Sequence, residues 1–292
     1  MNHSMIQKWQ AEKAITVKQG CELLNISRAG YYAALRKRKP QPICPIKVQL
    51  KSHFETSGRS YGSRRLVVDL NNQGIRIGRY RVRSLMKEMN IKAIWKRKFV
   101  NTTDSNHSLP IFENVLNRKF KPLAANQAWV SDITYIRTRS GWLYLAAVLD
   151  LYSRKIVGWA MASTMPAELV CTALQLAICQ RQPKPGLVVH SDRGSQYASH
   201  EYRDLLNRYD CIGSMSRKGN CWDNAVMERF FLNLKMERVW RQDYANFEEA
   251  RCNVTDYMIN FYNIQRLHST LGYLSPNNYE AKMITKEPIV VS

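Results

Sequence analysis

The feature of this sequence that most restricts its fold is a series of three apolar runs at residues 129–136, 142–149 and 156–161. Only short turns separate these runs, so we expect them to pair as three consecutive antiparallel strands. Beyond them, helical and strand-like patterns alternate through residues 168–180, 187–190, 199–209 and 211–215, before a further helix around Glu228. Strands in hairpin order followed by such an alternation predict an α/β fold with a mixed sheet.

Three carboxylates occupy places that this fold brings together. Asp132 lies within the first predicted strand, Asp192 follows the strand at residues 187–190, and Glu228 lies on a predicted helix 36 residues after Asp192. In an RNase H-like mixed sheet the two aspartates stand on adjacent central strands, and the helix that carries the glutamate packs across the sheet edge. Carboxylate oxygens suit hard cations such as Mg²⁺ or Mn²⁺. We therefore predict that Asp132, Asp192 and Glu228 are catalytic and bind metal.

Such a triad fits phosphoryl transfer on a nucleic-acid backbone. Two divalent ions about 3.5–4 Å apart activate an oxygen nucleophile and stabilise the leaving 3′ oxygen. The protein must supply a few carboxylates from rigid elements and leave room for substrate oxygens, and three carboxylates are enough for this purpose.

Other polar and aromatic residues near the triad compete with this assignment or support it. Asp150 follows an apolar strand but is flanked by turn-like residues. Asp223 lies just before the glutamate helix and is assigned to the helix start, as a cap or as a partner of the helix dipole. His190 is expected to support the site rather than to bind metal, because imidazole is a poor ligand for Mg²⁺. Trp129 and Trp222 are expected in the core.

The net charge of +21 is unevenly distributed along the chain. Residues 1–120 contain 24 Lys and Arg against 7 Asp and Glu, whereas residues 121–292 contain 20 against 16. A basic module attached to a more balanced body is typical of proteins that bind a polyanion. A basic surface that serves only solubility is the alternative, and attachment to ribosomes or membranes would leave the acidic triplet unexplained.

Two helical patterns lie within the basic part. Residues 17–24 and 28–38 predict a helix, a short turn and a second helix, which is typical both of helix-turn-helix modules and of ordinary helical hairpins. Residues 79–89 predict an amphipathic helix with one apolar face, formed by the side chains at 82, 85, 86 and 89, and one basic face. The basic face is either a solvated surface or, as we prefer, part of a second helix-turn-helix that contacts DNA.

The candidate DNA contacts are all cationic. Lys235, for example, follows Glu228 by two helical turns on the same face, where it would point at DNA that runs past the metal site. The full set is Arg28, Arg64, Arg65, Arg79, Arg81, Arg83, Lys87, Arg193, Lys218, Lys235 and Arg266.

Cysteine usage and hydropathy indicate an intracellular, soluble protein. The seven cysteines are odd in number and contain no Cys-x-x-Cys pair, so we expect reduced thiols rather than disulfides or a zinc site. The longest uncharged apolar run, at residues 142–149, is far too short to span a bilayer. No membrane partner is expected.

The chain resembles the OrfB transposases of the bacterial insertion-sequence group called IS-three and, more widely, the DDE transposases and retroviral integrases. Residues 21–32 look like the N-terminal signature of that family, and residues 61–66 with 74–78 look like its second helix-turn-helix. The contexts of the three carboxylates match its catalytic motifs, and Lys235 occupies its basic position after the glutamate. The tail at residues 262–280 matches its C-terminal signature.

This resemblance implies a Mg²⁺-dependent DNA strand-transfer enzyme with two metal ions, for which Mn²⁺ can substitute. Such enzymes cleave at the ends of a mobile element to free 3′ hydroxyls, which then attack a phosphodiester. A first transfer joins the two ends through a circular intermediate, and a second inserts the element into target DNA. The resemblance also implies double-stranded DNA as the partner, a homodimer or higher oligomer on it, and a cytoplasmic, nucleoid-associated location in bacteria. In this family the active protein is usually a frameshift fusion with an upstream reading frame.

We expect small all-α modules before the RNase H-like catalytic core. The predicted boundaries are a basic helix-turn-helix-like segment at 1–42, a helix-turn-helix domain at 46–100, a linker at 101–124, the core at 125–240 and a helical extension of the core at 241–292. Two other functions remain as alternatives. One is a transposase-derived DNA-binding regulator without catalysis, and the other is an RNase H-like nuclease that hydrolyses without joining.

Overall fold

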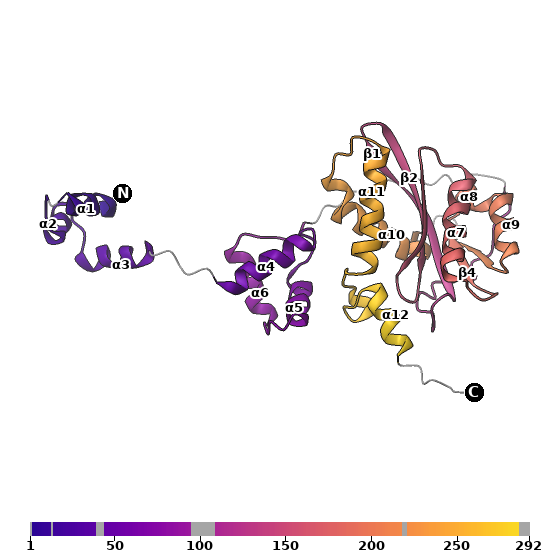
Figure 1. Ribbon diagram of the computed structural model, residues 1–292, viewed down its shortest axis with the longest axis horizontal. Helices are drawn as coiled ribbons and strands as arrows, with labels where there is room; N and C mark the ends of the chain where they lie inside the picture. The colour runs from indigo at the N-terminus through magenta and orange to yellow at the C-terminus, as the bar shows by residue number, and fades with distance from the viewer. Residues whose placement is uncertain (1, 13, 39–43, 95–108, 218–220, 286–292) are drawn as a thin grey trace. The chain divides into compact units, whose positions relative to one another are not determined.

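The computed structural model describes residues 2–12, 14–38, 44–94, 109–217 and 221–285 (Figure 1). The chain divides into two compact units, Met1–Val48 and Gln49–Ser292. Lys218, one of the expected DNA contacts, lies outside the described residues. No helix in the described ranges combines the length and the apolar composition that a membrane crossing requires.

The first unit contains a small helical cluster. Its helices are α1 (Asn2–Ala11), α2 (Val17–Leu23) and α3 (Arg28–Arg38). Ile6, Cys21 and Tyr31 are almost fully buried where these helices meet. Ser27 Oγ accepts a hydrogen bond from the Gly30 amide and so caps the start of α3. The pair of helices predicted from the sequence is confirmed.

The second unit begins with helices that have one apolar and one basic side. They are the larger part of α4 (Pro45–Thr56), α5 (Ser63–Asn72) and α6 (Arg79–Glu88). On α6, Val82 and Leu85 are fully buried, whereas Arg79, Arg83 and Lys87 are exposed. The apolar and basic faces predicted for this helix are therefore confirmed. Glycine precedes both α5 and α6 at the N-cap.

A five-stranded sheet in the order β3-β2-β1-β4-β5 forms the centre of the second unit (Figure 1). The strands are β1 (Ala128–Thr138), β2 (Gly141–Asp150), β3 (Ile156–Ala162), β4 (Val188–Ser191) and β5 (Ile212–Met215). The first three pair antiparallel, and β4 and β5 extend the sheet in parallel. This is the mixed, RNase H-like sheet predicted from the apolar runs, with β1 and β4 as neighbours.

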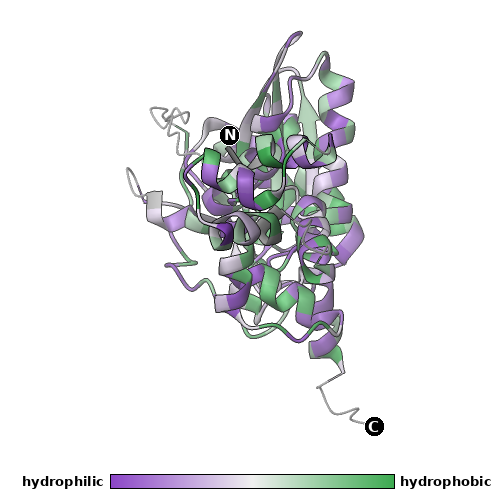
Figure 2. Cartoon of the chain, turned by 90° about the vertical axis from the view of Figure 1, so that its left-hand side faces the viewer, coloured by the Kyte–Doolittle hydropathy of each residue, from purple (hydrophilic) through white to green (hydrophobic). Residues whose placement is uncertain are grey.

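Helices cover both faces of the sheet (Figure 1). One face packs against α7 (Ala167–Arg181), α8 (Ser195–Ala198) and α9 (His200–Arg208). The other face packs against α10 (Ala225–Glu237), α11 (Phe247–Asp256) and the π-helical segment η3 (Tyr257–Asn263). Many helices carry both hydrophilic and hydrophobic residues (Figure 2), as expected for elements with one face on the sheet and one in solvent.

Close helix-to-sheet packing depends on a glycine in β3. A Cβ atom at Gly158 would collide with the backbone carbonyl oxygen of Ala173 on α7. Because that oxygen belongs to a helix backbone, it cannot rotate away as a side chain could. Gly158 therefore lets α7 approach β3 closely, and the two elements share an apolar core.

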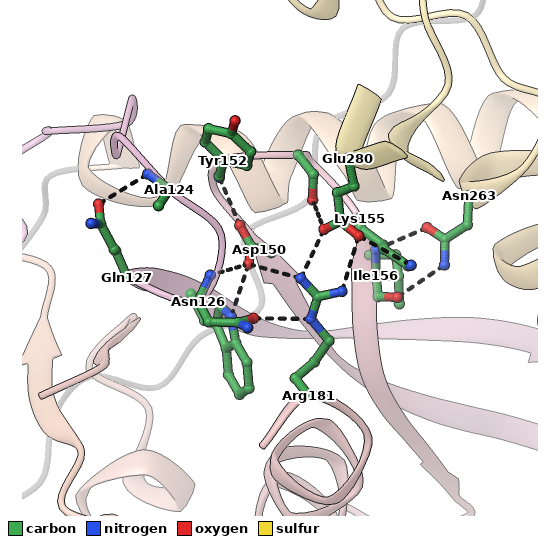
Figure 3. Close-up of polar contacts among 12 residues, drawn as sticks. Ala124, Asn126, Gln127, Asp150, Tyr152, Lys155, Ile156, Arg181, Asn263 and Glu280 are labelled. Atoms are coloured by element: carbon green, nitrogen blue, oxygen red, sulfur yellow. Dashed lines mark hydrogen bonds and ion pairs between the residues drawn. The ribbon is translucent and has the colours of Figure 1, made fainter. Parts of the chain in front are cut away.

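The C-terminal helix is fastened to the sheet by an ionic network (Figure 3). On α12 (Pro276–Ile284), the Glu280 carboxylate accepts two hydrogen bonds from the Arg181 guanidinium, at 2.8 and 3.0 Å. It also accepts one from Ser153 Oγ at 2.7 Å and one from Lys155 Nζ at 3.3 Å. These donors outweigh the burial of Glu280 and lower its pKa. The network ties α12 to α7 and to the β2–β3 turn.

Candidate active site

The two predicted catalytic aspartates lie where two parallel strands separate. β1 and β4 pair only through Ala128–Val188, Trp129–Val189 and Val130–His190. Asp132 and Asp192 each follow the last of these pairs by two residues. Residues at equal offsets on parallel neighbours share a sheet face, and neighbouring strands lie about 4.8 Å apart. The register therefore brings the two carboxyl groups to one place, beside the carboxyl end of β4.

Local hydrogen bonds orient both aspartates. Asp132 Oδ1 accepts a hydrogen bond from the Ile133 amide at 2.8 Å. Asp192 Oδ1 accepts one from the Gly194 amide at 3.0 Å, which fixes the turn between β4 and α8. Each of these bonds engages one edge of a carboxyl group through the nearby backbone. The carboxyl groups are thus held by the main chain on both strands.

Glu228 approaches this place from the first turn of α10. Met227, Phe230 and Leu234 are buried against the sheet, while Glu228 is exposed. Although the side chain is exposed, the surrounding protein removes part of the water around its carboxyl group and so raises the pKa of Glu228 above its ordinary value. The helix thus presents an exposed carboxyl group beside its apolar packing face.

The charges of both other carboxyl groups reach Asp132. The pKa of Asp132 is raised well above its ordinary value, first by burial, then by the negative charge of Asp192 and further by Glu228. The cation of Lys235 opposes this rise. Mutual repulsion between negative groups at one place is the electrostatic condition that a bound cation relieves.

Lys235 is held at the same place by an aromatic ring. Its Nζ lies 4.4 Å from the centroid of the Tyr135 ring, in a cation–π contact. Burial lowers the pKa of Lys235, and Asp132 partly restores it. Lys235 follows Glu228 by seven residues, so the two side chains lie on the same side of α10. A role of Lys235 in contacting DNA stays a prediction.

A buried hydrogen-bond network behind Asp132 joins β1 to both flanking layers. Ser131 Oγ and Tyr197 Oη lie 3.0 Å apart, and Asn224 Nδ2 donates to the Ser131 carbonyl oxygen at 3.3 Å. Burial, together with the charge of Asp132, raises the pKa of Tyr197, so this hydroxyl stays neutral. Asn224 directly precedes α10 and so connects the helix of Glu228 to the strand of Asp132. Sequence reasoning missed this network, although Asn224 lies only four residues before Glu228.

His190 has a supporting role, as expected. Its ring is fully buried between Ser214 Oγ at 2.9 Å and Ser216 Oγ at 3.2 Å, which fixes β5 to β4. Burial lowers the pKa of His190 to about 4, so the imidazole is neutral near pH 7. Its two ring nitrogens are both engaged by hydroxyl groups.

The competing carboxylate Asp150 is saturated by structural contacts (Figure 3). Its Oδ2 accepts hydrogen bonds from the Asn126 amide at 2.7 Å and from Trp129 Nε1 at 3.2 Å. Its Oδ1 accepts one from the Tyr152 amide at 2.8 Å, and Arg181 lies 3.8 Å away. The turn assignment made from the sequence is correct, because this carboxylate organises the end of β2.

Asp223 lies just before α10, as expected, but it does not cap this helix, whose N-cap is Asn224. Asp223 lies in η1 (Cys221–Asn224), and its carboxylate accepts hydrogen bonds from Arg118 Nε at 2.7 Å and from the Arg217 amide at 3.0 Å and Nε at 3.1 Å. These bonds lower its pKa to about 2 although burial acts in the opposite direction. Asp223 therefore joins the segment before β1, through Arg118, to the segment after β5, through Arg217. Trp129 is buried as expected, but Trp222 is 69% exposed and is no core residue.

The structure corrects one of the expected DNA contacts. Arg266 is only 2% exposed, and its guanidinium donates to both carboxylate oxygens of Glu237, at 2.7 and 2.8 Å. A guanidinium used in this way cannot reach a phosphate. Arg65 is partly buried, with its guanidinium 5.4 Å from the centroid of the Tyr61 ring. A contact of Arg65 with DNA stays a prediction, whereas the burial of Arg266 could not be read from the local sequence.

The other expected DNA contacts are placed as follows. Arg193 is partly buried, and its Nε donates to the Ser216 carbonyl oxygen at 2.6 Å. The remaining arginines and the lysine of the basic helices are exposed, namely Arg28, Arg64, Arg79, Arg81, Arg83 and Lys87. Their availability to a phosphate agrees with the expectation, but their binding to DNA stays a prediction.

The donor set at the triad fits a hard divalent cation. Within the described ranges, no three His, Cys, Asp or Glu side chains already form a cluster that could hold an ion together. Mg²⁺ does not require one, because it usually takes one or two protein carboxylates and completes its shell with water and substrate phosphates. The Asp132 and Asp192 carboxyl groups, which are close enough for the charge of Asp192 to raise the pKa of Asp132, provide such a pair.

Three family models match parts of the chain. A family model described as an integrase core domain matches residues 122–221, and a second integrase core model matches residues 209–276. An HTH-like domain model matches residues 45–99.

Two curated relatives match most of the chain. It is 38% identical over 290 residues to the transposase InsF for insertion sequence IS3A of Escherichia coli, with 97% of this chain and 99% of the relative covered. It is 42% identical over 265 residues to an uncharacterized 31 kDa protein of insertion element IS600 of Shigella sonnei, with 90% and 97% covered. Among solved structures, a simian T-cell lymphotropic virus intasome gives a TM-score of 0.48 at 14% identity, covering 84% of this chain and 76% of that one. The assignment therefore rests on the sequence relatives: the chain belongs to the IS3-family transposases and has an integrase catalytic core.

Proposed function

We propose that this transposase cleaves DNA at the 3′ ends of an insertion sequence and transfers those ends to new phosphodiesters in a metal-dependent reaction. The observation that carries the proposal is the meeting of Asp132 and Asp192 at the separation of β1 and β4, with Glu228 near enough to raise the pKa of Asp132 further. Carboxyl groups gathered in this way serve phosphoryl transfer rather than fold stability.

Asp132, Asp192 and Glu228 would hold two Mg²⁺ ions, with Mn²⁺ as a substitute. When bound, such ions activate the attacking oxygen and stabilise the leaving 3′ oxygen. The charges of Asp192 and Glu228 both reach Asp132, which supports a role for Asp132 in holding the ions. Lys235, on the same side of α10 as Glu228, would contact the DNA backbone next to the reacting phosphate.

Double-stranded DNA is the proposed substrate, both as element ends and as target. The exposed basic face of α6 would contact an element end, and its arginines suit phosphates and guanine edges alike. Two ends must be brought together, so we propose a homodimer or higher oligomer on DNA. Fusion with an upstream reading frame and a cytoplasmic, nucleoid-associated location in bacteria belong to the same proposal.

A strand-joining assay tests the proposed chemistry. Purified protein is incubated with a labelled duplex of the element end that carries a free 3′ hydroxyl, in Mg²⁺ and in EDTA. The test variant is Glu228→Gln. The matched control is Glu201→Gln, because Glu201 is also an exposed glutamate in the first turn of a core helix.

Joined product that disappears in EDTA and in Glu228→Gln, but persists in Glu201→Gln, supports the proposal. Equal product from Glu228→Gln and the wild type contradicts the role of the triad. Cutting without joining would indicate a nuclease. Binding without any reaction, even by a chain fused to the upstream frame, would indicate a DNA-binding regulator.

A further inference from the structure

The DNA-binding helices contact the catalytic core through a buried tyrosine. Tyr61, in the loop before α5, is 4% exposed, and its Oη accepts a hydrogen bond from the Leu267 amide at 2.9 Å. Toward α4, the Tyr61 amide donates a hydrogen bond to Ser57 Oγ at 3.3 Å, and Ser57 Oγ donates one to the Phe54 carbonyl oxygen at 2.7 Å. The loop that carries Tyr61 is therefore anchored both to α4 and to the C-terminal part of the core.

The same loop also lies against the C-terminal end of α10, the helix that carries Glu228. Gly58 has a φ of +59°, and a Cβ there would lie 3.2 Å from Arg241 Nη1 and 3.6 Å from the Glu237 carbonyl oxygen. Glu237 is the last residue of α10, and Arg241 ends the short η2 helix (Val239–Arg241) that follows it. Glycine at this position permits both the left-handed backbone and the close approach.

A buried ion pair joins these two contacts into one junction. Arg266, the residue before Leu267, donates to both carboxylate oxygens of Glu237, and Tyr257 Oη donates to the same carboxylate at 2.7 Å. Burial alone would raise the pKa of Glu237, but the charge and hydrogen bonds of Arg266 keep it low, so the pair is ionised. The segment that receives Tyr61 is thereby fixed directly to α10.

α10 connects this junction to the catalytic site. Glu228 and Glu237 are nine residues apart, which is about 13.5 Å along a helix at about 1.5 Å per residue. Nine residues also amount to two and a half turns, so the two glutamates lie on opposite flanks of the helix. Glu228 thus points to the other carboxylates, while Glu237 points to the junction.

We infer that Tyr61 is a positioning residue that sets which phosphate of a bound DNA end reaches the carboxylates. The helices that would hold the DNA are fixed to the helix that carries Glu228, and a fixed distance between the two selects the site of cleavage. This inference rests on the proposed function. A tyrosine that only fills space at the junction would affect stability without changing the position of the cut.

Two variants of Tyr61 and one control separate these roles. Tyr61→Ala removes the ring, and Tyr61→Phe removes only the hydroxyl group that accepts a hydrogen bond from the Leu267 amide. The control is Tyr244→Phe, because Tyr244 is 1% exposed and its hydroxyl donates to Asn253 Oδ1 at 3.0 Å entirely within the core. Cleavage of an element-end duplex is mapped to the nucleotide, and hydroxyl-radical footprints are taken in the catalytically inactive Glu228→Gln background.

A displacement of about 1 Å at the reacting atoms can cost an enzyme roughly 100-fold in rate. For Tyr61→Ala we expect the ratio of cleavage at the wild-type phosphate to cleavage at the neighbouring phosphates to fall at least about tenfold. We also expect the footprint over the cleavage site to weaken while that of the DNA-binding helices remains. Tyr61→Phe should lower the cleavage ratio and weaken the footprint over the cleavage site by smaller amounts. Tyr244→Phe should change neither the cleavage ratio nor that footprint.

A single unchanged cut position and an unchanged footprint in Tyr61→Ala would overturn the inference. If Tyr61→Ala does not fold, the same two measurements are made on Tyr61→Phe. An unchanged cut position and an unchanged footprint in Tyr61→Phe would then overturn the inference. The footprint needs no turnover. A wild type that binds but never cuts would contradict the proposed chemistry, while loss of the core footprint in Tyr61→Ala would still support the positioning role.

Discussion

Replacing Arg266 with methionine should strongly destabilise the second unit, because Glu237 would stay buried without its cation. The two side chains are 2% and 7% exposed and share two hydrogen bonds of 2.7 and 2.8 Å. Removing one partner of a buried ion pair costs about 3–5 kcal/mol. A domain of this size loses about 2–4 °C in Tm for each kcal/mol, so we expect Tm to fall by about 6–20 °C. Thermal denaturation followed by circular dichroism at pH 7 measures this change.

The double variant Arg266→Met/Glu237→Gln should recover part of the loss. It removes the unpaired charge, and glutamine still offers an acceptor to the Tyr257 hydroxyl. The control is Arg139→Met, which breaks the exposed ion pair with Asp243 and should leave Tm unchanged. A loss below about 1 kcal/mol for Arg266→Met would refute the burial of this pair. It would also restore Arg266 to the residues that could contact DNA.

Three other perturbations have definite expected outcomes. Because the pKa of His190 is about 4 in the folded protein against 6.5 ordinarily, the unfolded chain binds protons more readily. The free energy of unfolding should therefore fall by about 3 kcal/mol between pH 7.5 and pH 4, and His190→Gln should lack this part of the pH dependence in urea titrations. Gly158→Ala should cost about 1–3 kcal/mol in the same assay, because its Cβ would meet a helix backbone, whereas Gly78→Ala, with open space around it, should cost far less. Arg83→Ala or Lys87→Ala should weaken binding to an element end and lower its salt dependence by about one phosphate each, and unchanged binding would place the DNA surface elsewhere.

Much of the fold follows from the sequence because its patterns are local. The apolar runs of β1, β2 and β3 are long and separated by short turns, so their pairing is determined by neighbouring residues. The amphipathic face of α6 is equally local. Even the meeting of Asp132 and Asp192 follows from strand order, since the carboxyl end of β4 must lie beside β1 in such a sheet.

The corrections concern charges whose partners are distant in sequence. Arg266 is buried because Glu237 lies opposite it, 29 residues earlier, and Asp223 is held by Arg118, 105 residues away. An arginine whose acidic partner is not known resembles a DNA contact in the sequence. The prediction that Trp222 lies in the core is also wrong, since its ring is 69% exposed. No local pattern distinguishes this tryptophan from Trp129, which is buried.

The opposed glutamates of α10 have a consequence for how this family can diverge in sequence. Substitutions along the helix change one side chain at a time, and many would leave both ends in place. An insertion or deletion of one residue between Glu228 and Glu237 would instead turn one end relative to the other by about 100° and shift it by about 1.5 Å. Members of the family should therefore differ in this segment by substitutions at constant length. The surface turns of the same core, in contrast, can also change in length.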